Sequence, residues 1–219
     1  MRVVLFGATG MVGQGVLREC LLDPAVASVL AVGRSPTARR HPKLHEIIHD
    51  NFLDFSRLEP QLTGLEACFF CLGVSSIGMD EARYRRLTYD VTMAAATMLA
   101  KLNPQMVFVY VSGRGTDQSE RGSLMWARVK GKTENDLLKL PFKAAYMFRP
   151  AGIQPLHGIR SKTAWVQAIY VASAPLLSLL NRLAPSYMTT TEQIGRAMIR
   201  VARDGYTKPV LESEDINRL

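Results

Sequence analysis

Three glycines near the start of the chain have a spacing that suits phosphate binding. Gly7, Gly10 and Gly13 follow the apolar run 3–6 and precede a stretch with apolar residues at helical spacing. Glycine lets backbone N–H groups approach a pyrophosphate closely, and a helix N-terminus supplies further donors and partial positive charge. A strand, glycine turn and helix in this order predict dinucleotide binding. The loop residues expected to hold the pyrophosphate are Gly7, Thr9, Gly10, Met11, Val12 and Gly13.

The residue that follows the second predicted strand, 28–32, indicates which dinucleotide is bound. An Asp or Glu at this point would accept a hydrogen bond from the ribose 2′-OH of NAD. The chain has Gly33 and Arg34 instead, and Arg34 stands about twenty residues after the last glycine of the loop. Because a guanidinium can bond a 2′-phosphate through two N–H groups, we expect NADP(H), with NAD as the alternative.

Two further cofactor contacts are predicted from position alone. Ligands of such folds lie outside the carboxyl ends of the strands. Cys71, Leu72 and Gly73 end the predicted strand 67–72 and are expected beside the ribose. Asp54 follows the predicted strand 46–50 and is expected to bond the adenine amino group.

The elements that would position these residues alternate between strands and helices. Such alternation predicts βαβ units and a doubly wound parallel α/β sheet, the Rossmann arrangement. We expect strands over 3–6, 28–32, 46–50, 67–72, 105–112 and 143–148, and helices over 11–22, 55–62, 80–102 and 124–140.

After Pro150 the pattern changes to a small, irregular C-terminal segment. We expect helices over 161–172 and from 190 or 191 to 202, with Thr189 and Glu192 as a capping box, and a late strand at 210–211. The whole chain, 1–219, is interpreted as a single domain, in which 151–190 is a lid on the substrate side. The uncharged stretch 164–180 would cover the substrate pocket.

The composition of the chain argues against a nucleic-acid-binding protein and against a membrane-spanning one. The chain has 219 residues, 47% hydrophobic and 21% charged, and a net charge of +8. Its Lys and Arg are scattered rather than gathered into a stripe with aromatic residues, which argues against a nucleic-acid partner. The stretch 164–180 is shorter than the roughly twenty residues of a membrane span and contains Pro175. Since no targeting segment precedes the first strand, we expect a cytoplasmic protein.

Two arrangements of potential ligands are interpreted as structural. Cys68 and Cys71 form a C-x-x-C pattern, but within a strand residues three apart face opposite sides. His41, His45 and His49 would need a helix to meet at one metal, and Pro42 opposes a helix there. The sequence therefore predicts no metal site.

Several motifs together resemble the short-chain dehydrogenase/reductase superfamily. The resemblance covers most of the chain, 1–150, and is greatest to atypical, NAD(P)-binding members related to the HIV Tat-interactive protein and to epimerase/dehydratase-like proteins. The motifs are Gly7-Ala-Thr-Gly10-Met-Val-Gly13, Cys71-Leu-Gly73, Tyr110-Val-Ser112, Val129-Lys130-Gly-Lys132 and Phe148-Arg149-Pro150.

The resemblance implies a catalytic pair, Ser112 and Lys130, but not the superfamily's usual phenol. Ser112 would bond the substrate oxygen, and Lys130 would hold the nicotinamide ribose. Trp126 stands where Tyr is usual, four residues before Lys130, and an indole N–H has no useful acidity near neutral pH. Three interpretations stay open: catalysis is lost, Lys130 is itself the acid or base, or another phenol, Tyr84, enters the site.

Two functions follow from these interpretations. The first is an NADP(H)-dependent oxidoreductase that acts on a small carbonyl or hydroxyl compound. The alternative is a non-catalytic NADP(H)-binding regulatory or sensor protein, which Trp126 favours. The resemblance also implies a homodimer through the two long helices, an arrangement common in the superfamily.

Overall fold

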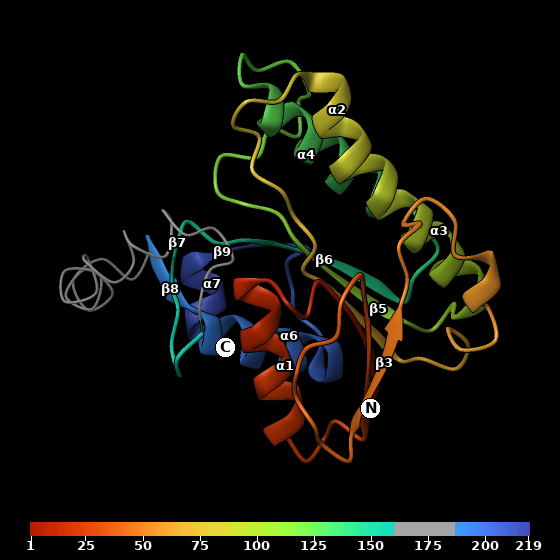
Figure 1. Ribbon diagram of the computed structural model, residues 1–219. Helices are drawn as coiled ribbons and strands as arrows, with labels where there is room; N and C mark the ends of the chain where they lie inside the picture. The colour runs from red at the N-terminus through yellow and green to blue at the C-terminus, as the bar shows by residue number, and fades with distance from the viewer. Residues whose placement is uncertain (160–186) are drawn as a thin grey trace.

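The computed structural model describes residues 1–159 and 187–219, and its centre is a seven-stranded parallel sheet (Figure 1). The strand order is β3-β2-β1-β4-β5-β6-β9. All six neighbouring pairs are parallel. The strands are β1 (Arg2–Phe6), β2 (Ser28–Gly33), β3 (Leu44–Ile48), β4 (Ala67–Phe70), β5 (Val107–Val111), β6 (Ala144–Arg149) and β9 (Val210–Glu212). The predicted doubly wound α/β fold is confirmed.

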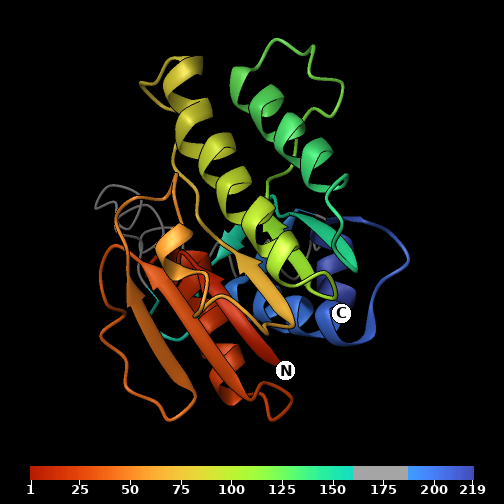
Figure 2. The ribbon, with the colours of Figure 1, turned by 90° about the vertical axis from the view of Figure 1, so that its right-hand side faces the viewer.

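Helices cover both faces of this sheet (Figure 2). One layer consists of α1 (Met11–Leu22), α6 (Thr191–Asp204) and α7 (Ser213–Arg218). The other contains α3 (Val91–Leu102) and α4 (Met125–Leu137), with a 3₁₀ turn at Ser56–Leu58. Strand residues alternate between the two layers: Val3 and Leu5 pack toward α1 and α6, and Val4 and Phe6 pack toward α3. The alternation explains why β1 is apolar throughout.

The predicted helix 80–102 is present, but a π turn interrupts it. Asp80 caps α2 (Glu81–Arg85) by accepting a 2.8 Å hydrogen bond from Arg83 N. The π turn Arg86–Asp90 follows and leads into α3. Such turns are rare in helices and often lie at functional sites.

The C-terminal part contains a second, two-stranded parallel sheet that the sequence did not predict. β7 (Gly152–Gln154) pairs with β8 (Met188–Thr190). The expected capping box at Thr189 and Glu192 is wrong by one residue. Thr190 Oγ1 accepts from Gln193 N, and Gln193 Oε1 accepts from Thr190 N, both at 3.0 Å. Thr189 belongs to β8 and is fully buried, so α6 begins one residue later than the box required.

Some predictions for the C-terminal segment concern residues that the structure does not describe. The expected helix 161–172, the stretch 164–180 and most of the lid lie outside the described residues. Among the helices in 1–159 and 187–219, none has the length and apolar character needed to cross a membrane.

The third strand begins earlier than predicted, at Leu44 rather than 46, because Leu44 pairs with Val29 of β2.

Candidate functional site

The turn after β1 requires glycine at two positions. Gly7 has φ +81°, a left-handed conformation, and a Cβ there would lie 2.7 Å from the Cys71 carbonyl group at the end of β4. A Cβ on Gly13 would lie only 2.0 Å from Gly7 O. The first helix therefore packs against the turn with backbone on backbone, as the glycine spacing predicted. Gly10 N donates to Gly7 O at 2.9 Å and closes the turn.

The N-terminus of α1 is suited to an anion. The helix begins at Met11 after Gly10, whose backbone is extended. Within the described residues no side chain caps this end, and its first turn carries no acid. The N–H groups of a helix's first turn have no partner inside the helix, and they carry its partial positive charge. A pyrophosphate fits this turn because glycine backbone and helix donors face it together.

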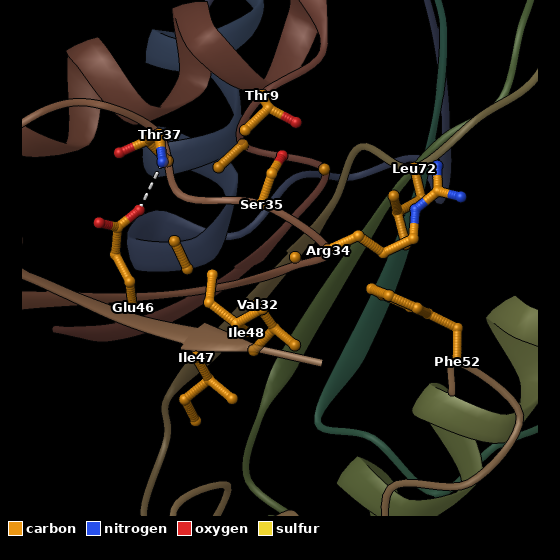
Figure 3. Close-up of a pocket in the computed structure, with 14 residues that line it drawn as sticks. Thr9, Val32, Arg34, Ser35, Thr37, Glu46, Ile47, Ile48, Phe52 and Leu72 are labelled. Atoms are coloured by element: carbon orange, nitrogen blue, oxygen red, sulfur yellow. Dashed lines mark hydrogen bonds between the residues drawn. The ribbon is translucent and has the colours of Figure 1, made fainter. Parts of the chain in front are cut away.

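A pocket of about 350 Å³ opens beside the glycine turn, between the ends of β2 and β3 (Figure 3). Thr9 and Leu72 border it on the side of β1 and β4. Arg34 extends across it toward Leu72 and Phe52. Hydroxyl groups and one carboxylate complete the polar lining, with Thr37 N donating to Glu46 Oε1 at 2.7 Å. The remaining lining residues include Gly7, Val32, Gly33, Ser35, Ile47 and Ile48.

A second pocket, of about 330 Å³, shares Arg34, Phe52 and Leu72 with the first. Its walls come from the segment after β3, the segment after β4 and the start of the long helix. Apolar side chains with a few polar groups are typical of a site for a small organic molecule. The further lining residues are Asp50, Asn51, Leu53, Gly73, Val74, Arg86, Leu87 and Val91. The two pockets adjoin at these three shared residues, and we refer to them together as the groove.

The structure brings most of the predicted cofactor residues to this groove. Gly7, Thr9, Arg34 and Leu72 line the first pocket, and Gly73 lines the second. Gly10, Met11, Val12 and Gly13 form the adjoining turn and helix start. Cys71 adjoins Gly7 through its backbone, and its N–H donates to Phe6 O at 3.0 Å.

Asp54 is not among the residues that line the groove. Its carboxylate accepts a 2.9 Å hydrogen bond from Ser56 N, and it borders a separate depression beside Met93. That hydrogen bond holds the pKa of Asp54 below its usual range. Asn51 and Phe52 lie in the groove instead. They directly follow the predicted strand 46–50, so their nearness to the end of that strand is the signal that could have indicated them in place of Asp54.

The two candidate catalytic residues meet at the end of β5, where Lys130 from the middle of α4 contacts Ser112. Lys130 Nζ donates a 2.7 Å hydrogen bond to Ser112 O. Burial of the ammonium group lowers the pKa of Lys130 to about 8, against an opposing attraction from Glu134 one helical turn away. A lysine in this state exchanges protons near neutral pH, which an exposed lysine does not.

The hydroxyl of Ser112 belongs to a hydrogen-bonded chain. Thr116 Oγ1 donates to Gly113 O at 2.7 Å, and a hydroxyl has one proton to donate. The 2.8 Å contact between Ser112 Oγ and Thr116 Oγ1 therefore has Ser112 as its donor. In this arrangement Ser112 Oγ presents lone pairs, so it can accept a hydrogen bond from a ligand.

Trp126 and Tyr84 are placed differently with respect to this site. The Trp126 indole lies over the loop after β5, with its Cη2 atom 3.5 Å from the position of a Cβ on Gly115. Tyr84 is 2% exposed, and burial raises the pKa of its phenol. A buried phenol of this kind does not reach a ligand, so the structure does not support Tyr84 as a replacement for the usual Tyr.

A buried ion pair fixes α4 to the sheet. The Glu134 carboxylate is fully buried, and Arg149, at the end of β6, donates to it from Nε at 2.9 Å and also from Nη2. Gln118 Nε2 donates to the same carboxylate at 3.0 Å. Because Glu134 lies one turn after Lys130, this pair also sets the position of Lys130 relative to β5. Among the described residues no group of three or more His, Cys, Asp or Glu is arranged to hold a metal.

Known structures share this fold. The Bordetella bronchiseptica enzyme WbmF, solved with NAD⁺, matches with a TM-score of 0.67 at 16% identity, over 99% of this chain and 76% of that one. A UDP-N-acetylglucosamine 4-epimerase from Methanobrevibacter ruminantium matches with a TM-score of 0.70 at 16% identity, over 96% of this chain and 75% of that one. At these identities the likeness establishes the fold, which is that of the Rossmann epimerases and dehydratases.

Two curated relatives are more similar to this chain in sequence than these solved structures are. Protein HTATIP2 of Rattus norvegicus is 25% identical over 200 residues, 90% of this chain and 79% of that protein. The mitochondrial protein fmp52 of Aspergillus clavatus is 33% identical over 159 residues, 68% of this chain and 64% of that protein. No family model matches. The comparisons confirm the resemblance to the atypical short-chain dehydrogenase/reductases that the motifs indicated, since the chain is similar to HTATIP2 and FMP52.

The expected cytoplasmic location is contradicted by these relatives. The FMP52 proteins of Aspergillus clavatus and Candida albicans are both named mitochondrial, the latter being 23% identical over 94% of this chain. The expectation relied on the residues before the first strand, and the start of a chain does not by itself decide the compartment.

Proposed function

We propose that the protein is an NADP(H)-dependent oxidoreductase that acts on a small carbonyl or hydroxyl compound. One observation supports this function above all: the uncapped start of α1, the groove through Arg34 and the partly buried Lys130 lie on one edge of the sheet. That edge is formed by the carboxyl ends of the parallel strands, where ligands of such sheets bind. The solved structure of WbmF with NAD⁺ adds support for a nicotinamide dinucleotide.

The proposed preference for NADP(H) rests on Arg34 and the hydroxyl side chains that line the first pocket with it. Arg34 would bond the 2′-phosphate through its N–H groups, with Thr9, Ser35 and Thr37 lining the same pocket. The carboxylate that lines this pocket, Glu46, accepts a hydrogen bond from Thr37 N. The glycine turn would hold the pyrophosphate, and the wall that includes Leu72 and Gly73 would face the adenosine half.

The proton of the reaction would come from the protein. NADPH held by the glycine turn and Arg34 would supply a hydride for a carbonyl carbon, whose oxygen then needs one proton. Lys130, with its pKa lowered to about 8, would donate that proton and regain it from water. Ser112 Oγ, whose own proton is directed to Thr116, would accept a hydrogen bond from the alcohol product and orient it.

The test of cofactor binding compares two arginines. Calorimetric titration with NADPH and NADH would be done on the native protein, on Arg34→Gln and on Arg57→Gln, an exposed arginine away from both pockets. Loss of a charge-assisted pair costs about 1.5–3 kcal/mol, which is roughly a tenfold to hundredfold loss of NADPH affinity. We expect that loss for Arg34→Gln only, with NADH affinity unchanged. Equal affinity of the native protein for both dinucleotides would refute the NADP preference.

The test of catalysis compares two lysines on α4. Cofactor oxidation would be followed with a panel of aldehydes and ketones, using the native protein, Lys130→Met and Lys132→Met. Lys132 points away to Asp136, to which it donates at 2.9 Å. We expect turnover to disappear in Lys130→Met alone. Tight NADPH binding with no turnover of any compound would instead favour a cofactor-binding sensor, the function that Trp126 in place of Tyr supports.

A further inference from the structure

Two neighbouring arginines at the π turn of the long helix lie in different surroundings. The Cζ atom of Arg85 is 4.9 Å from the centre of the Tyr89 ring, in a small depression against α4. Arg86, the next residue, lines the second pocket of the groove. The turn is anchored on its other face, where Tyr84 and Thr88 are buried. The backbone of Arg86 is therefore fixed beside the second pocket.

The second pocket has an excess of positive charge. Among the described residues that line it, Arg34 and Arg86 are cationic and Asp50 is the one acid. Neither arginine forms an ion pair or a side-chain hydrogen bond with another of the described residues. Two guanidinium groups that face one pocket repel each other, and an anion bound between them is attracted by both. The pocket is therefore suited to a ligand with a multiply charged anionic group.

The two arginines approach the pocket from different elements. Arg34 follows β2, and its side chain extends toward Leu72 and Phe52, which line both pockets (Figure 3). Its guanidinium group thus lies where the pockets adjoin. Arg86 comes from the long helix and lines only the second pocket, whose volume is about 330 Å³. A phosphate held where the pockets adjoin would have the hydroxyl groups of the first pocket on one side and Arg86 on the other.

We propose that Arg86 is a second arginine of the cofactor site, which binds the 2′-phosphate of NADP(H) together with Arg34. The inference rests on the proposed NADP(H)-dependent function and makes it more specific, because it assigns the phosphate to two arginines on separate elements. A phosphate monoester carries roughly two negative charges at neutral pH, so two guanidinium groups can neutralise it. Arg86 is then a specificity-determining residue that takes no part in proton or hydride transfer.

The experiment uses two nucleotides that correspond to the adenosine half of the cofactor. Adenosine 2′,5′-bisphosphate and adenosine 5′-monophosphate differ only in the 2′-phosphate. Each would be titrated calorimetrically into the native protein, Arg34→Gln and Arg86→Gln. We expect Arg86→Gln to bind the bisphosphate roughly tenfold more weakly than the native protein and to bind the monophosphate equally well. Because Arg86 is exposed, this substitution should leave the urea midpoint unchanged.

Arg85→Gln is the matched control for the loss of one positive charge. It removes the same charge from the adjacent position, outside the second pocket, so both nucleotides should bind as they do to the native protein. Added salt provides a second readout, since salt screens the attraction between exposed charges. The difference between the native protein and Arg86→Gln should narrow as salt is raised. A difference that salt does not change would mean that Arg86 acts through packing, and would overturn the inference.

The outcomes distinguish failure of this inference from failure of the proposed function. The inference alone fails if Arg34→Gln weakens binding of the bisphosphate and Arg86→Gln does not. It also fails alone if Arg86→Gln weakens binding of both nucleotides by the same factor, which would place Arg86 at the adenine or the 5′-phosphate. Equal affinity of the native protein for the two nucleotides would refute the NADP(H) preference, and this inference with it. Since no substrate is needed, the results hold whether the protein is a catalyst or a sensor.

Discussion

Replacing Gly10 or Gly13, at the start of α1, by alanine should impair different properties of the protein: NADPH binding in the first case and stability in the second. A Cβ on Gly13 would lie 2.0 Å from Gly7 O, about 1 Å short of the 3.0 Å below which real Cβ atoms do not approach. The opposing atom is backbone, so α1 must move away from β1 as a whole. A Cβ on Gly10 would meet the same oxygen at 3.3 Å, which a small adjustment relieves.

The loss of stability expected for Gly13→Ala depends on the side chains that α1 buries against the sheet. Val16, Leu17 and Cys20 are completely buried against the sheet, so a shift of the helix disturbs the packing of all three. Overpacking of a well-packed interior typically costs about 1–3 kcal/mol, and the backbone collision places Gly13→Ala near about 3 kcal/mol. With a urea slope of about 2 kcal/mol per molar, the unfolding midpoint should fall by roughly 1.5 M.

The assay is urea unfolding with and without NADPH, together with NADPH titration. Gly13→Ala should be destabilised in the absence of the cofactor. Gly10→Ala should unfold within about 1 kcal/mol of the native protein, which is the typical cost of alanine at an N-cap position. It should nevertheless bind NADPH at least tenfold more weakly, because the new methyl group lies where the pyrophosphate approaches the backbone.

Gly73→Ala is the control for stability, since a Cβ there meets nothing within 4 Å. Its stability should stay within about 0.5 kcal/mol of the native value. Two results would refute the reasoning: a Gly13→Ala protein that unfolds at the native urea concentration, or a Gly10→Ala protein that binds NADPH as tightly as the native one.

Two further predictions concern buried charges. The pKa of Lys130 is lowered to about 8 from an ordinary 10.5, so the unfolded chain binds more protons between these values and stability should rise with pH across this window. Lys130→Met should therefore be more stable than the native protein at pH 7, by on the order of 1–2 kcal/mol, and should lose this advantage above pH 10.5. Thermal unfolding of both proteins over the pH range measures the difference in stability. A difference that does not change with pH would contradict the prediction. Arg149→Met leaves the Glu134 carboxylate buried without its main partner, and urea unfolding should show a loss of about 3–5 kcal/mol. A loss below about 1 kcal/mol would mean that the pair does not hold α4 to the sheet.

The order of strands and helices could be predicted because each element has its own local pattern. The apolar runs of β1 and β5 and the glycine turn need no information from distant residues. Boundaries were less accurate where pairing decides them: β3 begins at Leu44 because of its register with β2, and α6 begins after Thr190 because Thr189 belongs to β8. The strands β7 and β8 are three residues each and pair across more than thirty positions, so no local signal marks them.

In the candidate site, too, some features follow from local sequence patterns and others depend on contacts between distant segments. By itself the sequence determined the glycine turn, Arg34 after the second strand and a lysine one turn after Trp126, because these depend on spacing along single elements. Only the tertiary structure decided that Asn51 and Phe52, and not Asp54, line the groove with Arg34. It also decided the direction of the hydrogen bond from Ser112 and the place of Arg86 in the pocket that Arg34 lines. These contacts join separate loops, and their geometry depends on how the strand ends pack together rather than on any residue's neighbours in sequence.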